Sequence, residues 1–186
     1  MLAQLRPAIV LMLLFTLLLG LAYPLAITGI GQAAFPAQAN GSRIERDGVL
    51  IGSSLIGQNF AGAGYFHPRP SAADYNAASS GASNLGPTSM ALRNAIVERS
   101  AALALDMPVP ADAVTTSGSG LDPHISPAFA RTQVARIATA RALPPEQVAA
   151  LLAATIEHPV LGLIGEPQVN VLRLNLALDA MAPPAS

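Results

Sequence analysis

Lysine and cysteine are both missing from this chain of 186 residues. Without lysine, the chain cannot build a P-loop of the G-x-x-x-x-G-K-[ST] type, a Schiff base or a Ser-x-x-Lys nucleophile. Without cysteine, it has no disulfide, no cysteine-ligated zinc site and no thiol nucleophile. These two absences exclude many enzyme classes before any motif is considered.

Charge is scarce as well. Charged residues make up 11% of the chain, whereas an ordinary soluble domain has about 25%. The 10 basic and 11 acidic residues give a formal net charge of −1, and the basic residues form no cluster. Because nucleic-acid binding needs a basic patch, we expect no nucleic-acid partner. The charge deficit also indicates that part of the chain does not face water.

The longest apolar run explains this deficit. No charged residue occurs between Arg6 and Arg43, and the centre of this gap, residues 7–30, is almost entirely apolar. As a helix, this run would extend for roughly 36 Å, which is enough to cross a hydrocarbon core of about 30 Å. The sequence therefore predicts one transmembrane helix over residues 7–30. A cleavable signal peptide is the alternative, since residues 37–39 have a small-x-small pattern, but this apolar run exceeds the usual length of about 7–15 residues.

The charges around the span predict its orientation. A short stub, residues 1–6, carries the α-amino group and Arg6, and basic flanks tend to stay in the cytoplasm. After the span, residues 31–42 form a small, polar connector that precedes Arg43. We therefore expect a cytoplasmic N-terminus and one domain, residues 43–186, outside the cytoplasm.

The outer domain begins with a hairpin signal. Residues 43–56 contain two short extended runs around Asp47-Gly48, a dipeptide that favours a tight turn with positive φ. Residues 57–87 are then rich in glycine, serine, asparagine, alanine and proline. A segment of this length is unusual as a connection unless it is functional, disordered or held by a partner.

Capping residues and prolines predict three helices and a final strand. The helices are expected to start after Ser89, at Pro127 after the Ser126 cap, and at Pro144-Pro145-Glu146. Residues 168–178 alternate between apolar and polar, which predicts a strand. The fold class expected is α+β: a single N-terminal transmembrane helix followed by one small extracytoplasmic α+β domain, with the hairpin and the terminal strand packed by helices.

Few residues have the spacing of a catalytic or metal site. The three histidines lie far apart in the sequence, without the spacing of metal ligands, so we expect no metal site. Residues 116–127 contain Ser119, Asp122 and His124, but the G-x-S-x-G frame of a nucleophile elbow is missing. We interpret this stretch as a turn-rich loop that is structural or contacts a partner. A membrane-anchored envelope serine hydrolase and a ligand-binding module remain the alternatives.

Several motifs together resemble a known family. In chain order they are Gly52–Phe60, Tyr65–Ser71, Tyr75-Asn76, Ser83–Gly86, Ser117–Pro127, Gln133–Ala138, Gly165-Glu166, Val169–Leu172 and Leu174–Asp179. This series resembles the C subunit of the Kdp potassium-transporting ATPase over nearly the whole chain, including the single N-terminal span. Because many unrelated motifs occur in the same order, the resemblance is specific.

The resemblance implies a non-catalytic, accessory role. The family belongs to a high-affinity, ATP-driven potassium uptake complex of the bacterial inner membrane, in which a channel-like subunit carries potassium and a P-type ATPase subunit hydrolyses ATP. The C subunit would be single-pass, with its main domain in the periplasm. It would bind no covalent cofactor: ATP would be bound by the ATPase subunit, and potassium is the transported ion.

The family's C subunit is also described as a catalytic chaperone that raises the ATP affinity of the ATPase subunit. By resemblance, Gln133 in the Gln-x-x-Arg motif is the residue linked to this role. The expected topology conflicts with a direct version of it, because a periplasmic Gln133 cannot touch cytoplasmic ATP. Any such effect would have to reach the nucleotide through coupled conformational equilibria of the membrane subunits.

We expect the two turn-rich stretches to contact the partner subunits. Residues 57–87 and 117–127 are predicted to dock on the external face of the channel-like subunit, while the span contacts membrane lipid and partner helices. The residues predicted to make partner contacts are Gln58, Tyr65, Arg69, Tyr75, Asn76, Ser83, Asn84, Ser117, Ser119, Asp122 and His124.

Overall fold

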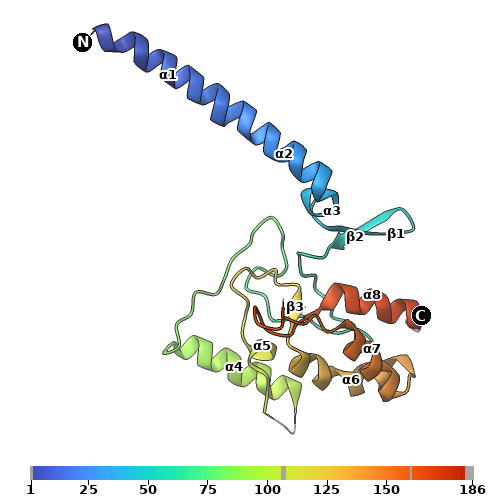
Figure 1. The fold of residues 1–186 in the computed structure, drawn as a ribbon. Coiled ribbons are helices and arrows are strands. Elements are labelled where there is room, and N and C mark those ends of the chain that lie inside the picture. Colours follow the sequence, from blue (N-terminus) through green and yellow to red (C-terminus); the bar gives the residue numbers. More distant parts are fainter. Residues whose placement is uncertain (1, 106–107, 160, 183–186) are drawn as a thin grey trace. The chain divides into compact units, whose positions relative to one another are not determined.

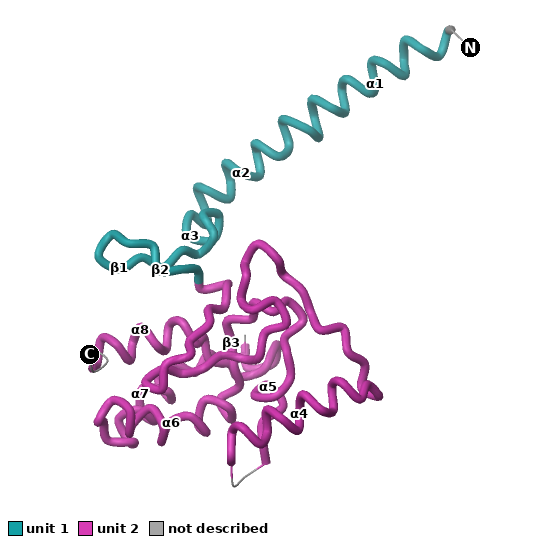
Figure 2. The backbone as a smooth tube through the Cα atoms, turned by 180° about the vertical axis from the view of Figure 1, so that it is seen from behind, with its two compact units in different colours: residues 1–53 teal, residues 54–186 magenta. Residues whose placement is uncertain are grey.

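A computed structural model describes residues 2–105, 108–159 and 161–182 of the chain (Figure 1). The chain divides into two compact units, residues 1–53 and 54–186 (Figure 2). The first unit contains a long helix and a hairpin, and the second contains helices with a short two-stranded sheet. The α+β class expected from the sequence is confirmed.

The long helix of the first unit consists of α1 (Leu5–Leu17), a π-helical turn (Leu18–Ala22) and α2 (Tyr23–Ala34). Together they form 30 residues with a mean hydropathy of 2.4, and none of the most apolar window is buried within the chain. At about 1.5 Å per residue the helix is roughly 45 Å long, more than a hydrocarbon core of about 30 Å. It begins before the predicted start at residue 7 and ends after the predicted end at residue 30.

Pro24 is accommodated by the π-helical turn that precedes it. A proline within a helix lacks the backbone N–H, and its ring collides with the carbonyl four residues earlier. Here the Tyr23 N–H donates to the Leu18 carbonyl, five residues earlier, so the helix is widened just before Pro24. The Thr28 hydroxyl in turn donates to the Pro24 carbonyl at 2.8 Å. The helix therefore continues through the proline with its neighbouring backbone groups paired.

The remainder of the first unit is a short helix and the predicted hairpin. Helix α3 (Pro36–Ala39) follows the span. Strand β1 (Arg43–Arg46) then pairs antiparallel with β2 (Val49–Ser53). Asp47 and Gly48 form the turn between the strands with φ angles of 53° and 75°, as their residue types favour.

The second unit is built from five helices and one small sheet in the described part of the chain. The helices are α4 (Met90–Leu103), α5 (Ala111–Val114), α6 (Pro127–Arg141), α7 (Pro145–Thr155) and α8 (Val171–Met181). Strand β3 (His124–Ile125) pairs antiparallel with β4 (Val169–Asn170). Ser89 and Ser126 cap α4 and α6 by accepting backbone N–H groups, so these two predicted helix starts are confirmed. The core packs α6, α7 and α8 around Ile137, Leu152 and Leu174.

The predicted strand over residues 168–178 is wrong. Only Val169 and Asn170 are in a strand, and α8 starts directly after them. The Asn170 side chain accepts the Arg173 N–H at 3.1 Å and caps this helix. Residues at positions 171, 172, 174, 175 and 178 are buried, which is the spacing of a helical face. A short apolar run fits the spacing of a strand as well as that of a helix. Here the Asn170 cap and the packing of the buried face favour the helix.

Residues 54–89, which we call the polar segment, contain no helix or strand and lie against residues 117–123, the serine-glycine loop. The Gly57 N–H donates to the Leu121 carbonyl at 2.7 Å, and the Gly81 N–H donates to the Ser119 carbonyl at 2.9 Å. A Cβ atom on Gly57 would lie 2.6 Å from the Asp122 carbonyl oxygen, so only glycine permits this approach. The two stretches in which the sequence predicts partner contacts thus bind to each other.

Candidate functional site

Around Phe66 and His67, the backbone of the polar segment is paired with side chains. The Asn175 side chain of α8 accepts the Phe66 N–H at 2.8 Å and donates to the Phe66 carbonyl at 3.0 Å. The Gln133 side chain of α6 does the same for the next residue: it accepts the His67 N–H at 2.7 Å and donates to the His67 carbonyl at 3.1 Å. We call Asn175 and Gln133 the amide clamp, since together they pair every backbone polar group of two consecutive residues.

Two arginines of α6 extend this pairing towards the start of the segment. Arg136 donates to the carbonyls of Ala63 and Tyr65 and, at 2.7 Å, to the Gln133 side-chain oxygen. Burial lowers the pKa of the Arg136 guanidinium. Its three acceptors replace the water that burial removes, as a buried charge requires.

Arg141 is buried and uses all of its nitrogens within the chain. Its Nε donates to the Gly64 carbonyl and its Nη1 to the Ala182 carbonyl, both at 2.6 Å, while Nη2 lies 2.8 Å from the Asp179 carboxylate. The guanidinium carbon also lies 4.6 Å from the centre of the Tyr65 ring. Lysine has neither the flat fork nor the number of donors for this arrangement, so position 141 requires arginine.

These contacts show where two residues singled out from the sequence lie. Gln133 is the residue that the resemblance links to ATP affinity, and Tyr65 is one of the predicted partner contacts. Gln133 is buried, and both polar atoms of its amide bind His67 and Arg136 of its own chain. Tyr65 is half-buried, and its ring contacts both Phe60 and Arg141. Both side chains therefore contact groups of their own chain and stabilise the conformation of the polar segment.

A second group of charged residues joins the serine-glycine loop to the helices. Arg69 lies 3.1 Å from the Asp122 carboxylate, whose other oxygen accepts the His124 N–H at 3.0 Å. The His124 ring lies 3.8 Å from Glu157, and Glu157 lies 3.2 Å from Arg173. Burial alone would raise the pKa of Asp122, but hydrogen bonds from His124 and the Arg69 charge outweigh it and hold this pKa below its usual value.

The serines of the loop stabilise turns. The Ser117 hydroxyl accepts the Gly120 N–H at 2.9 Å, and the Ser119 hydroxyl accepts the Leu121 N–H at 3.0 Å. In the described part of the chain, no hydrogen bond joins Ser119 to His124, whose ring nitrogens face two carboxylates. Nor do three histidine, aspartate or glutamate side chains there meet in a metal-binding group. This geometry is that of a structural loop.

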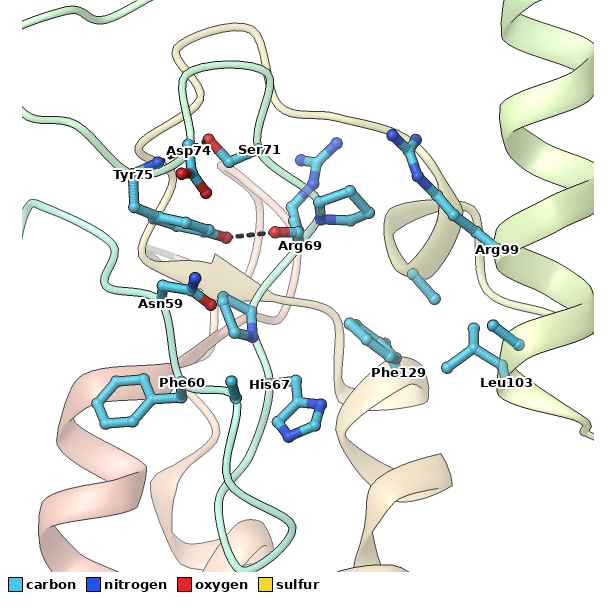
Figure 3. Close-up of a pocket in the computed structure, with 15 residues that line it drawn as sticks. Asn59, Phe60, His67, Arg69, Ser71, Asp74, Tyr75, Arg99, Leu103 and Phe129 are labelled. Carbon is cyan, nitrogen blue, oxygen red and sulfur yellow. Dashed lines mark hydrogen bonds between the residues drawn. The ribbon is translucent and has the colours of Figure 1, made fainter.

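An open depression of about 520 Å³ lies between the polar segment and α4. Figure 3 shows Arg69 on the segment and Arg99 on α4, and Phe129 of α6 also lines the depression. The Tyr75 hydroxyl donates to the Arg69 carbonyl, and Arg99 donates to the Val114 carbonyl at 2.7 Å. Burial, together with the Asp122 charge, raises the pKa of Tyr75 to about 12, so this phenol is neutral at physiological pH. No sequence signal marks Arg99 as a site residue, because it lies in a helix without a distinctive motif.

The residues predicted to contact partners differ in exposure. Those fully at the surface are Asn76, Ser83, Asn84 and Ser119, which we call the exposed rim; Gln58, Tyr65, Arg69, Tyr75, Asp122 and His124 are partly buried, and Ser117 is buried. The rim residues lie on two neighbouring stretches, which a bond from the Ser80 hydroxyl to the Ser119 carbonyl connects at 2.9 Å. The rim is thus the most exposed part of the predicted contact surface.

The structure thus combines one apolar N-terminal helix with a unit whose buried polar side chains bind their own backbone. The family model described as "KdpC: K+-transporting ATPase, c chain" matches residues 5–180. The chain therefore belongs to the KdpC family, a non-catalytic subunit of the Kdp potassium-transporting ATPase, with one N-terminal membrane span.

Similar proteins match the chain along its length. Potassium-transporting ATPase KdpC subunits from Caulobacter vibrioides and Cereibacter sphaeroides are 58% and 57% identical to it, over 99% and 97% of this chain and 96% and 98% of the relatives. The corresponding subunit from Rhodopseudomonas palustris is 54% identical over 98% of this chain and 100% of its own length. The resemblance found in the motifs is thereby confirmed.

Replacing Asn175 with leucine tests the amide clamp. The Asn175→Leu variant leaves the buried N–H and carbonyl of Phe66 unpaired, and we expect a loss of about 2–4 kcal/mol in the free energy of unfolding. Urea unfolding of the full chain in detergent measures this loss. The control is Gln147→Leu, which changes an exposed amide on α7 and should alter stability by about 0.5 kcal/mol or less. Equal stability of the two variants would contradict the clamp.

His67 predicts a pH dependence of stability. Burial, aided by the Arg136 charge, lowers the pKa of His67 from 6.5, although the bond from its ring to the Gly62 carbonyl opposes this. The unfolded chain therefore takes up the proton first, so stability falls as the pH drops below 6.5 towards the lowered value. We expect His67→Gln to reduce this fall, measured by urea unfolding between pH 7.5 and 5.5. His158→Gln, which changes an exposed histidine, should leave the fall as in the unmodified chain, and an unchanged fall in His67→Gln would contradict the assignment.

Proposed function

We propose that this chain stabilises the assembly of a high-affinity, ATP-driven potassium uptake complex from the outer side of a bacterial inner membrane. The observation that carries the proposal is the helix Leu5–Ala34, whose most apolar window has no residue buried within the chain. A helix that is apolar all round must be covered by lipid or by other helices. Membership in the KdpC family supports the view that the helices of the channel-like and ATPase subunits cover part of it.

The orientation rests on the charges that flank the span. Arg6 lies in the first turn of the helix without an acidic neighbour, whereas Arg43 and Arg46 follow the helix together with Glu45 and Asp47. The positive-inside rule then favours a cytoplasmic N-terminus and a periplasmic body.

In this orientation, the proposed increase in ATP affinity acts indirectly. The amide atoms of Gln133 bind His67 and Arg136, which supports a positioning role for Gln133. It fixes the polar segment, and the segment's docking on the partner biases the conformational equilibrium of the ATPase subunit. Such coupling between distant sites typically amounts to about 1–3 kcal/mol.

The exposed rim is the surface proposed to dock on the external face of the channel-like subunit, near the entrance for potassium. Its amides and hydroxyls bind polar groups and water without placing a charge beside the path of a cation. Arg69, Tyr75 and Asp122 support this rim by fixing the loops behind it. Substitutions of these supporting residues would alter the fold and the docking together. They therefore cannot show whether a loss of docking is direct.

The absence of native cysteine allows a direct test of orientation. A full chain with the single substitution Gln147→Cys carries its thiol on the exposed face of α7, outside the exposed rim, and one with Gln4→Cys carries it before the span. A membrane-impermeant maleimide should label Gln147→Cys in intact spheroplasts and Gln4→Cys only after permeabilisation. The reverse pattern would refute the periplasmic placement.

Asn84 allows a test of docking that preserves the fold. Asn84 has a φ angle of 53°, which glycine also adopts, so Asn84→Gly removes the amide without straining the backbone. We expect roughly three- to tenfold less of the channel-like subunit to co-purify with this variant, as is typical for one lost hydrogen bond, and slower growth at limiting potassium. Gln147→Ala, which changes an exposed amide on α7, is the control. If both variants retain the partner equally, the rim does not dock there.

A further inference from the structure

The open depression of about 520 Å³ between the polar segment and α4 is lined by two arginines. Arg69 reaches it from the segment and Arg99 from α4, and Figure 3 shows both guanidinium groups at the same end of the depression. Nη2 of Arg69 lies 3.4 Å from the Thr116 carbonyl oxygen, and Nη1 of Arg99 donates to the Val114 carbonyl at 2.7 Å. Thr115 is extended, with a φ angle of −109° and a ψ angle of 140°, so these two carbonyls are about 7 Å apart. One short stretch of backbone thus holds the two guanidinium groups near each other.

The charge of Arg99 has no counter-ion among the residues that the structure describes. Arg69 is paired with Asp122 at 3.1 Å, whereas in the described part of the chain Arg99 forms one hydrogen bond, to Val114, and no ion pair. Most of the five N–H donors of its guanidinium therefore have no protein acceptor there, although the side chain is partly buried. An anion that accepts several of these donors would stabilise such a charge.

The other titratable groups that line the depression do not balance this charge. Burial lowers the pKa of His67 and raises the pKa of Tyr75 to about 12, so both side chains are neutral at physiological pH. Asp74 also lines the depression, but it is exposed to water, and Figure 3 shows it on the side of Arg69 away from Arg99. One positive charge, that of Arg99, therefore remains to be balanced by a ligand.

Apolar side chains line the depression away from the two arginines. Leu103 follows Arg99 by four residues and therefore lies on the same face of α4. Phe129 of α6 lines the depression as well, and Figure 3 shows Leu103 and Phe129 at the end away from the guanidinium groups. Sites for small molecules typically have a volume of about 300–1,000 Å³ and a mostly apolar lining with a few convergent polar groups. The depression has this combination of size and lining.

We propose that this depression binds a small organic acid that has one carboxylate and an apolar body. The carboxylate bridges Arg69 and Arg99, since one carboxylate accepts N–H groups from two guanidinium groups at about 2.8 Å. The apolar body packs against Leu103 and Phe129. A monoanion balances the single charge of Arg99, whereas phosphate or a dicarboxylate would add a second negative charge near Asp122. This binding function is separate from the docking proposed for the exposed rim.

Benzoate is the probe for this site, and benzamide, which has nearly the same shape without the charge, is its control. We expect the unmodified full chain in detergent to bind benzoate with a dissociation constant of about 1 mM, as is usual for a ligand of this size. Benzamide should bind about tenfold more weakly, because it lacks the charge that Arg99 requires. Saturation-transfer NMR measures both affinities. Equal affinities for the two compounds, or no saturable binding of benzoate, would overturn the proposal.

A pair of arginine variants locates the bound carboxylate. Arg99→Gln removes the charge but keeps an amide that can donate to the Val114 carbonyl, and it should weaken benzoate binding by about tenfold. The matched control is Arg93→Gln, which removes an exposed charge from the same helix and should bind benzoate as the unmodified chain does. Equal affinity of the two variants for benzoate would contradict the assignment.

A second pair of variants tests the site without removing an arginine. Ala102 is exposed, lines the depression and lies three residues after Arg99, on the same face of α4. Ala102→Glu therefore places a carboxylate of the chain itself beside Arg99, and it should abolish benzoate binding without lowering the melting temperature. Ala101→Glu, at an exposed position outside the depression, should bind benzoate normally. Unchanged binding by Ala102→Glu would place the benzoate elsewhere and overturn the proposal.

The same measurement on the assembled complex separates a free acid from a partner side chain. Benzoate should bind to the complex about as well as to the isolated chain. Binding to the isolated chain alone would show that another subunit fills the depression, and it would overturn the assignment to a free acid. Arg99→Gln should co-purify normally with the other subunits, so the failure of this site would leave the assembly role intact.

Discussion

The backbone around Phe66 and His67 is held by side chains, and the packing of the second unit depends on this pairing. Phe66 is buried, yet within the described residues no strand pairs with its N–H and carbonyl. Asn175 and Gln133 take the place of that strand, and Arg141 fixes the residues before it. Since unpaired buried polar groups are costly, these side chains make it possible for a glycine- and proline-rich segment to form part of a packed body.

Local signals in the sequence predicted those elements whose cause is local. Asp47-Gly48 marks the hairpin turn and Ser126 marks the start of α6, because each acts on backbone groups a few residues away. The end of the chain was harder. Residues 168–178 fit the spacing of both a strand and a helix. The Asn170 cap is a local signal for the helix, but the buried face that favours it packs against distant parts of the chain, and its Asn175 binds a residue 109 positions earlier. A window of ten to twenty residues does not contain those long-range contacts.

The candidate site could also be predicted only in part. Motifs indicate which residues are important, but not whether a side chain binds its own chain or is exposed to a partner. Gln133 and Arg69 belong to such motifs and bind their own chain, whereas Asn84 is at the surface. Leu161, Leu163 and Ile164 form a short apolar cluster in the sequence, which usually indicates core, yet all three side chains are exposed.

The long sequence separation between Asn175 and the residue it binds also sets an order of events during synthesis. Phe66 leaves the ribosome 109 residues before Asn175, an interval of roughly 5–20 s at about 5–20 residues per second. The membrane helix is complete long before that, so a nascent chain is tethered to the bilayer while its second unit still lacks its last helix. Until α8 emerges, Gln133 can bind the backbone of His67, but the N–H and carbonyl of Phe66 have only water as a partner. A chain truncated before α8 would therefore remain anchored and leave the backbone of Phe66 without its native partner.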